Sequence, residues 1–292
     1  MASLKEVKTR IASVNSTRKI TSAMKMVASS KLHRAQQAIE NMRPYEQQLT
    51  RIMSTFVGSM EGEVDTAYAS QREVKRVVIV LFTSNSSLCG GYNANVVREF
   101  VKKVEEYRHR DVEISRVYAV GKKAAEAVGK LKTFDLVDNS ALLDCPSYRE
   151  TAKIASELMD LYDKGDIDEV DLIYHHFKSA GTQLLTTEVF LPIDLCTCSS
   201  EEGAANNLNF IVEPSVNDIV NQLIPKSLYL RLYTALLDSL ASEHAARMIA
   251  MQVATDNADD LLRELTLTYN KTRQQAITNE LLDIAGGSAA QQ

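Results

Sequence analysis

Tryptophan is absent from this chain of 292 residues, and aromatic residues make up only 6% of it. Glycine and proline are also scarce, with eleven and five residues, whereas the apolar fraction of 45% is ordinary and allows a sizeable core. Because glycine and proline interrupt helices, their scarcity beside many alanines, leucines, lysines, glutamates and methionines favours long helices.

Long apolar runs and clustered cysteines are missing as well. Four cysteines in a chain of this length do not indicate a disulfide framework. No run approaches the ~18 apolar residues that could span a bilayer. The N-terminus lacks the apolar segment of a secretory signal, and its lysines and arginines lead directly into a helical pattern rather than a transit peptide. The sequence therefore predicts a cytoplasmic soluble protein.

Charge is unevenly distributed along the chain. Residues 1–51 contain ten lysines and arginines against three glutamates, a net charge of +7. The net charge of the whole chain is −5, so the remaining residues have a net charge of −12. Such asymmetry between segments suggests a partner that is recognised electrostatically.

The first forty residues predict one continuous helix, because Ala2–Arg43 contains neither glycine nor proline. Ser3 and Glu6 have the spacing of a capping box at its start, and Pro44 is expected to bend the helix before it continues toward Phe56. Such a helix is a rod of roughly 65 Å. Its apolar residues fall into three drifting sets, which is typical of a helix wound about a partner: Leu4, Val7, Ile11 and Val14; then Ile20, Met24 and Val27; then Ala28, Leu32, Ala35, Ile39 and Met42.

A second long helix is predicted near the C-terminus, where Lys226–Ala285 again lacks glycine and proline and would extend roughly 90 Å. Ser215 is expected to cap its start, Pro225 to kink it, and Gly286-Gly287 to stop it. Its apolar register has the three-four spacing of a coiled-coil seam, with Met251, Ala254, Ala258, Leu261 and Leu265.

The middle of the chain has a different pattern, in which short strands alternate with helices. Val77–Phe82 is an unbroken apolar run, typical of a strand buried on both faces of a parallel sheet. Alternation of this kind predicts an α/β layer domain. The other expected strands are 112–120, 133–137, 170–177 and 184–191, and the expected helices are 94–107, 121–131 and 148–162.

Two half-apolar rods of matching period must bury each other, which predicts an antiparallel coiled coil beside the central domain. The last helix is longer than the first, so part of it should protrude and need a protein sleeve. The predicted division is an N-terminal coiled-coil helix, a central α/β domain, a C-terminal coiled-coil helix and a short tail, at 1–57, 74–196, 210–286 and 287–292.

No motif predicts catalysis, a cofactor or a metal site. Cys89-Gly90-Gly91 and Gly121-Lys122-Lys123 match neither glycine-rich phosphate-binding template. His175 and His176 are neighbours in a predicted strand and should face opposite sides, so they cannot grip one metal together. Cys196-Thr197-Cys198 has no second pair at zinc spacing.

The basic first helix has three functional interpretations. Nucleic-acid binding is disfavoured, because Met1–Arg43 has no aromatic platform and no recognition motif. Binding to an anionic membrane surface is disfavoured, because the apolar face is narrow and interrupted by threonine and serine. A solvated coiled-coil face that meets an acidic protein partner is favoured.

Segments at both ends and in the middle resemble the gamma subunits of F-type ATP synthases, in the same order. They are Lys19–Lys31, Leu88–Asn93, Ala241–Met251, Ala254–Ala258, Tyr269–Lys271 and Ile277–Leu281. The resemblance implies a coiled coil with a small α/β domain that acts as a rotor shaft. It implies partners too: catalytic and non-catalytic ATPase ring subunits, a small epsilon-type subunit and a membrane proton ring, at the cytoplasmic face of a bacterial inner membrane. The chain itself would be non-catalytic.

The same resemblance implies contact residues. Met24, Lys25 and Arg247 match positions where the shaft of the family meets acidic loops of the catalytic subunits, and the upper contact zone is matched by Gln274, Thr278, Glu280 and Asp283. Phe210 and Glu213 match the end near the membrane ring. Val212 departs from the aromatic residues common there, and Asn279 stands where many relatives have glutamine.

A cysteine-bearing insert of the chloroplast type is missing, which argues against thiol regulation and favours a bacterial origin. Two other functions stay open at this point: a nucleotide-binding α/β enzyme with helical arms, and a coiled-coil adapter that does not rotate.

Overall fold

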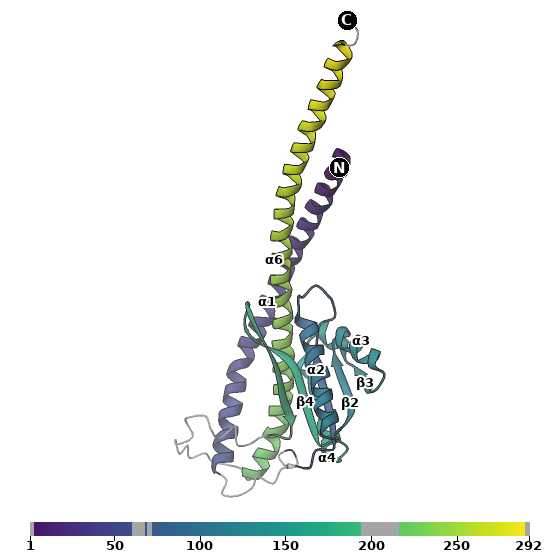
Figure 1. Ribbon diagram of the computed structural model, residues 1–292. Helices are drawn as coiled ribbons and strands as arrows, with labels where there is room; N and C mark the ends of the chain where they lie inside the picture. Colours follow the sequence, from purple (N-terminus) through teal and green to yellow (C-terminus); the bar gives the residue numbers. More distant parts are fainter. Residues whose placement is uncertain (1–2, 60–67, 69–71, 194–215, 290–292) are drawn as a thin grey trace. The chain divides into compact units, whose positions relative to one another are not determined.

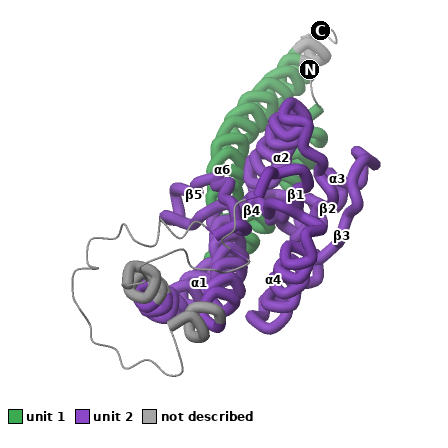
Figure 2. Tube along the Cα trace, turned by 90° about the horizontal axis from the view of Figure 1, so that it is seen from below, with its two compact units in different colours: residues 1–29, 247–292 green, residues 30–246 purple. Residues whose placement is uncertain are grey.

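The computed structural model describes residues 3–59, 68, 72–193 and 216–289. The chain divides into two compact units, shown in different colours in Figure 2. Unit 1 contains residues 1–29 and 247–292, and unit 2 contains residues 30–246. Two long helices, α1 (Leu4–Ser59) and α6 (Val216–Ala289), contribute residues to both units (Figure 1).

Unit 2 also contains a sheet and its covering helices. The strands are β1 (Arg76–Phe82), β2 (Glu113–Val120), β3 (Asp135–Asp138), β4 (Glu169–Ser179) and β5 (Thr182–Leu191). The helices are α2 (Tyr92–His109), α3 (Lys122–Leu131), the short 3₁₀ helix η2 (Ser140–Leu143) and α4 (Tyr148–Asp163).

The five strands form one sheet in the order β3-β2-β1-β4-β5. β1 is central and pairs in parallel with β2 and β4, β2 pairs in parallel with β3, and β5 returns antiparallel along β4. Because successive side chains point to opposite faces of a strand, β1 supplies two cores. Val78, Val80 and Phe82 lie in one core, and the intervening residues Val77, Ile79 and Leu81 lie in the other.

Different helices cover the two faces of the sheet. Phe100 of α2 and Val128 of α3 pack into the core on one face. Leu158 of α4 and the α6 residues Leu228 and Leu236 pack into the core on the other. β1 is therefore buried on both sides, which explains its continuous apolar sequence.

In unit 1 the ends of α1 and α6 lie side by side in antiparallel directions. Arg18 of α1 donates to the Asp259 carboxylate of α6 at 2.8 Å, and the hydroxyls of Thr21 and Thr255 are 2.8 Å apart. The residue number rises along α1 as its partner's number falls along α6, so the two helices run in opposite directions. Ala28 of α1 and Met251 and Ala258 of α6 are among the buried residues.

The predicted fold class, an antiparallel coiled coil with a central α/β layer domain, is confirmed. Each expected strand and helix of the central region appears within a few residues of its predicted bounds. α1 continues through Pro44 and α6 through Pro225. The four-part division of the sequence stays a prediction, and the Ser215 cap lies outside the described residues.

One predicted helix end is wrong. α6 continues through Gly286-Gly287 and ends at Ala289. A glycine lowers helix stability by ~1 kcal/mol relative to alanine, but it ends a helix only where the chain turns into the left-handed conformation. Two glycines near the end of a helix of 74 residues therefore do not force a stop.

Candidate functional site

The end of α6 extends beyond the start of α1 (Figure 1). The register set by Arg18–Asp259 and Thr21–Thr255 places Leu4, the first residue of α1, opposite about residue 273 in an antiparallel pair. α6 therefore has four turns or so, about residues 274–289, without a partner from α1. We call this segment the overhang.

The overhang exposes large apolar side chains on a helical segment that has no partner helix among the described residues of unit 1. Ile277, Leu281 and Ile284 follow three-four spacing and are 45%, 62% and 65% exposed, and Leu282 beside them is 65% exposed. Contiguous exposed apolar surface marks an interaction site, and a helical stripe with this spacing fits a groove or sleeve made by another protein.

The residues predicted for the upper contact zone lie in this overhang. Gln274, Thr278 and Glu280 are exposed. The Thr278 hydroxyl donates to the Gln274 carbonyl oxygen at 2.9 Å, so it lies along the helix backbone. Asp283 lies in α6, but its side chain is outside the described part of the chain.

Met24, Lys25 and Arg247 also lie in unit 1, and each is partly buried. The antiparallel register places Arg247 opposite about residue 29 or 30, about one helical turn from Lys25 along the pair. The structure therefore brings these three predicted contact residues into one region of the coil.

Two members of the predicted seam do not face the partner helix. Ile20 and Val27 are 60% and 57% exposed, although the sequence placed them with Met24 in a buried stripe. Thr21 and Ala28, each one position further along, occupy the interface, and of these two only Ala28 belonged to a predicted apolar set. Ile20, Val27 and Met26 are therefore exposed apolar residues of α1, and only the imperfect heptads of this helix indicated them in the sequence.

The basic end of α1 remains available to an acidic partner. Arg18 pairs with Asp259. Lys5, Lys8, Arg10 and Lys19 are exposed and form no ion pair with any described residue. Four uncompensated cations along one helix attract acidic surfaces over about a Debye length, ~8 Å at physiological salt.

The predicted contacts at the other end cannot be placed. Phe210 and Glu213, with the departing Val212, lie outside the described residues.

The carboxyl edge of the sheet, where α/β folds bind ligands, is closed by internal bonds. The first N–H groups of α3 are satisfied by the turn after β1, since Lys122 N donates to Asn85 Oδ1 and Ala124 N to Thr83 Oγ1. The Tyr92 hydroxyl lies 2.6 Å from the Ser239 hydroxyl of α6. The start of α3 therefore offers no anion cradle of the kind that binds phosphates.

The two adjacent histidines of β4 behave differently because they face opposite sides, as predicted. His175 is buried, stacks on Tyr92 with ring centroids 4.5 Å apart, and has a pKa lowered to about 4 by burial. His176 is half exposed, and its Nδ1 lies 2.5 Å from the buried carboxylate of Asp238 on α6. They share no ligand, and the described residues contain no cluster of three side chains suited to a metal.

None of the helices in the described ranges combines the length and the apolarity that crossing a membrane requires.

Known sequences similar to this chain come from ATP synthases. A family model described as ATP synthase matches residues 3–290. The ATP synthase gamma chain of Phocaeicola vulgatus is 56% identical over 290 residues, covering 99% of this chain and 100% of the relative. That of Flavobacterium johnsoniae is 47% identical over 290 residues, covering 99% of each.

Solved structures with a similar fold include a chain from the central stalk and c-ring of the Tetrahymena thermophila mitochondrial ATP synthase. It is 27% identical with a TM-score of 0.58, and the match covers 80% of this chain and 99% of that one. A chain from the OSCP, F1 and c-ring assembly of the Euglena gracilis mitochondrial ATP synthase is 20% identical with a TM-score of 0.64. This match covers 98% of the present chain and 94% of the Euglena chain. The second match, at this identity, concerns the fold alone.

Proposed function

This chain belongs to the family of ATP synthase gamma chains, the rotor subunits of the central stalk, and we propose that its rotation couples proton flow to ATP synthesis and hydrolysis. The observation that supports this most strongly is the overhang of α6. An apolar helix end without a partner in its own unit requires a sleeve, and a ring of ATPase subunits around the shaft supplies one.

The coiled pair of unit 1 has the mechanical properties of a shaft. Two antiparallel helices in register resist torsion better than one helix, because twisting must shear contacts such as Thr21–Thr255. The chain therefore transmits torque and asymmetry, and ATP chemistry takes place on the ring subunits. We propose that the chain on its own is not an enzyme.

Specific residues receive roles under this proposal. Met24, Lys25 and Arg247 contact acidic loops of the catalytic subunits, where cations give a contact that changes with rotation angle. The bearing contacts within the sleeve are assigned to Gln274, Thr278, Glu280 and Asp283. Phe210 and Glu213 are assigned to the end near the membrane ring.

The proposed partners are the catalytic and non-catalytic ring subunits, a small epsilon-type subunit and the proton-carrying membrane ring. The similar solved structures come from ATP synthase assemblies that contain a central stalk, F1 and a c-ring, and we infer the partners of this chain from them. The proposed location is the cytoplasmic face of a bacterial inner membrane, where the chain is held peripherally by the complex.

Reconstitution tests this function. The purified chain should show no ATP turnover, and adding it to ring subunits should raise coordinated ATP hydrolysis strongly. Turnover by the chain alone would instead indicate a nucleotide-using enzyme.

A matched pair of variants tests the overhang itself. Leu281→Asp places a charge in the apolar sleeve and should lower the affinity for the ring, because a charge would then be buried without a partner. Lys271→Asp, which changes an exposed residue on the preceding part of α6, is the control. Equal affinity of both variants would contradict the sleeve.

A further inference from the structure

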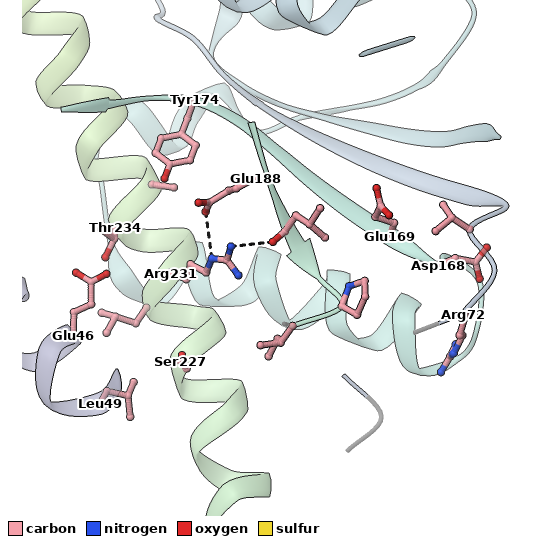
Figure 3. A pocket seen from close by; sticks show the side chains of 16 residues that line it. Glu46, Leu49, Arg72, Asp168, Glu169, Tyr174, Glu188, Ser227, Arg231 and Thr234 are labelled. Atoms are coloured by element: carbon pink, nitrogen blue, oxygen red, sulfur yellow. Dashed lines mark hydrogen bonds and ion pairs between the residues drawn. The ribbon is translucent and has the colours of Figure 1, made fainter. Parts of the chain in front are cut away.

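Unit 2 contains a cavity of about 700 Å³ that the rotor function does not use. It lies between α1, the β4–β5 hairpin and α6, and Figure 3 shows the described side chains around it. Its volume lies within the range of small-molecule sites, which are mostly apolar with a few placed polar groups.

Both cations in the cavity wall already have partners. Arg231 donates to the Glu188 carboxylate at 3.2 Å and to the Val189 carbonyl oxygen at 2.9 Å, drawn as dashed lines in Figure 3. Arg72 donates to the Tyr162 carbonyl oxygen and lies over the ring of that tyrosine, 4.9 Å from its centroid. The wall therefore has no uncommitted cation for an anionic ligand.

Three of the four carboxylates in the wall also have partners. Asp168 accepts the backbone N–H groups of Lys75 and Arg76 at 3.0 and 2.9 Å. Glu169 accepts the Tyr107 hydroxyl at 2.7 Å, and Glu188 binds Arg231. These groups are structural, because each completes a bond within unit 2.

The fourth carboxylate, Glu46 of α1, forms no hydrogen bond or ion pair with a described residue, although it is partly buried. Burial raises its pKa above the ordinary value, and Asp238 and Glu188 raise it further, against the opposing effects of Arg43 and His176. A cationic ligand would stabilise the ionised form of a carboxylate in this position, because it replaces the hydration that burial removes.

A second polar atom without a partner belongs to another residue that lines the same cavity. Thr234 Oγ1 of α6 is buried and forms no hydrogen bond within the described part of the chain. Figure 3 shows Thr234 and Glu46 facing the same part of the cavity from the two helices. Because this oxygen is enclosed, a ligand in the cavity cannot donate to it, and the Glu46 carboxylate supplies the acceptor.

The rest of the wall contains two hydroxyl residues, Tyr174 and Ser227, and is otherwise apolar, formed by Leu49, Val74, Val189, Pro192, Ile193, Leu230 and Ala235. This composition suits a hydrocarbon body attached to a charged head. A divalent metal is disfavoured, because it needs about six oxygen ligands and Glu46 with Thr234 supplies too few. A quaternary ammonium is disfavoured, because it has no N–H to donate.

We propose that this cavity binds a primary alkylammonium group. Its N–H groups donate to the Glu46 carboxylate, and its alkyl chain packs along Leu49, Leu230 and Ala235. The ammonium comes either from a free aliphatic amine or from a lysine side chain of a neighbouring subunit.

The test uses the purified full-length chain with n-hexylammonium as the probe and n-hexanol as its neutral isostere. Saturation-transfer NMR should show saturable hexylammonium binding and at least tenfold weaker hexanol binding. Glu46→Gln should weaken hexylammonium binding at least tenfold, since it removes the charge and keeps the shape.

Glu150→Gln is the matched control, because Glu150 is a helical carboxylate outside the cavity whose charge is paired with Lys153. It should leave hexylammonium affinity unchanged, and urea unfolding should show that both variants are folded. Binding should also weaken as the pH falls through the raised pKa of Glu46. Equal binding of hexanol, or equal effects of Glu46→Gln and Glu150→Gln, would overturn the proposal.

The assembled ATP synthase distinguishes the two sources of the ammonium. Saturable hexylammonium binding to the complex indicates a site for free amines. Binding to the isolated chain that is lost in the complex indicates that a subunit lysine fills the cavity. Absence of saturable binding to the isolated chain overturns the site from either source.

Discussion

Gly121 joins β2 to α3 with a backbone φ of +126°, a conformation that side chains rarely adopt. A Cβ at this position would lie 2.6 Å from both the carbonyl oxygen and the hydroxyl of Thr83, which is fully buried. Neither neighbour can move freely, because the Thr83 hydroxyl accepts Ala124 N and the Thr83 backbone N–H donates to the Val120 carbonyl oxygen at 2.9 Å. We expect Gly121→Ala to lower the free energy of unfolding by about 2–4 kcal/mol in urea titrations.

Gly181 provides the control for this substitution. It lies in the turn between β4 and β5, where an added Cβ meets nothing within 4 Å. Gly181→Ala should change the free energy of unfolding by about 0.5 kcal/mol or less. If the two alanine variants were equally stable, the close approach at Gly121 would not be a structural constraint.

His175 predicts a pH dependence of stability. Its pKa is about 4 in the folded chain, because burial disfavours the imidazolium, and about 6.5 when unfolded. Below pH 6.5 the unfolded chain therefore binds a proton that the folded chain does not. Stability should fall as the pH decreases from 6.5 to 4, by about 2 kcal/mol between pH 7.5 and pH 5.

The contribution of His175 is separated from that of the carboxylates by comparing variants at both pH values. His175→Gln should reduce the loss between pH 7.5 and pH 5 in urea titrations, because the glutamine does not titrate. His109→Gln, at an exposed position on α2, should keep the loss of the parent chain. An identical pH dependence in all three chains would contradict a neutral buried His175.

The sequence pattern predicted the orientation of the two β4 histidines but not their partners. The alternation of a strand was enough to predict that His175 and His176 face opposite sides. The partners of each histidine were not predictable, because Tyr92 and Asp238 are distant in sequence and meet them only in the folded sheet. Glu46 was inconspicuous in the sequence for the same reason, since its isolation depends on which side chains surround it.

At the scale of elements, the register of the coil can be tested by a cross-link. Thr21→Cys with Thr255→Cys places two thiols where the native hydroxyls are 2.8 Å apart. In a chain that also carries Cys145→Ser, which removes an exposed native thiol, mild oxidation should form this disulfide readily. The product is measured as a mobility shift in non-reducing electrophoresis.

An out-of-register pair controls for chance encounters. Thr21→Cys with Thr268→Cys moves one thiol by thirteen residues, ~20 Å along α6, and should remain largely reduced under the same conditions. Comparable cross-linking of both pairs would mean that the helices slide past one another.

Element types were predictable because their periods are strong, whereas the exact seam was not. The apolar run of β1 predicted a buried strand, and the scarcity of glycine and proline predicted the long helices. The seam of α1 was misassigned at Ile20 and Val27, because several apolar stripes of similar strength drift around one helix. Which stripe is buried depends on α6, so it cannot be decided from α1 alone.

At the scale of the whole molecule, the chain is built from helices that need proteins other than itself. Folding leaves apolar residues exposed along α6, including Val253 and Leu261 in the paired part and Leu281 in the overhang. A self-contained domain would bury more of such a surface. The number and order of ring subunits that cover it cannot be obtained from this chain, because they are properties of the partners.

Rotation distinguishes a shaft from a static adapter, and α6 offers two places to block it. Val253 is exposed in the part of α6 paired with α1, so a disulfide from Val253→Cys to a facing cysteine of the ring would have to twist two helices together. We expect this cross-link to lower ATP hydrolysis by the complex more than tenfold and reduction to restore it. Thr278→Cys lies on the overhang, where one helix can unwind and swivel, so its cross-link should inhibit less. Turnover is measured before oxidation, after oxidation and after reduction in the same preparation, and full activity with the Val253 cross-link intact would identify an adapter that does not turn.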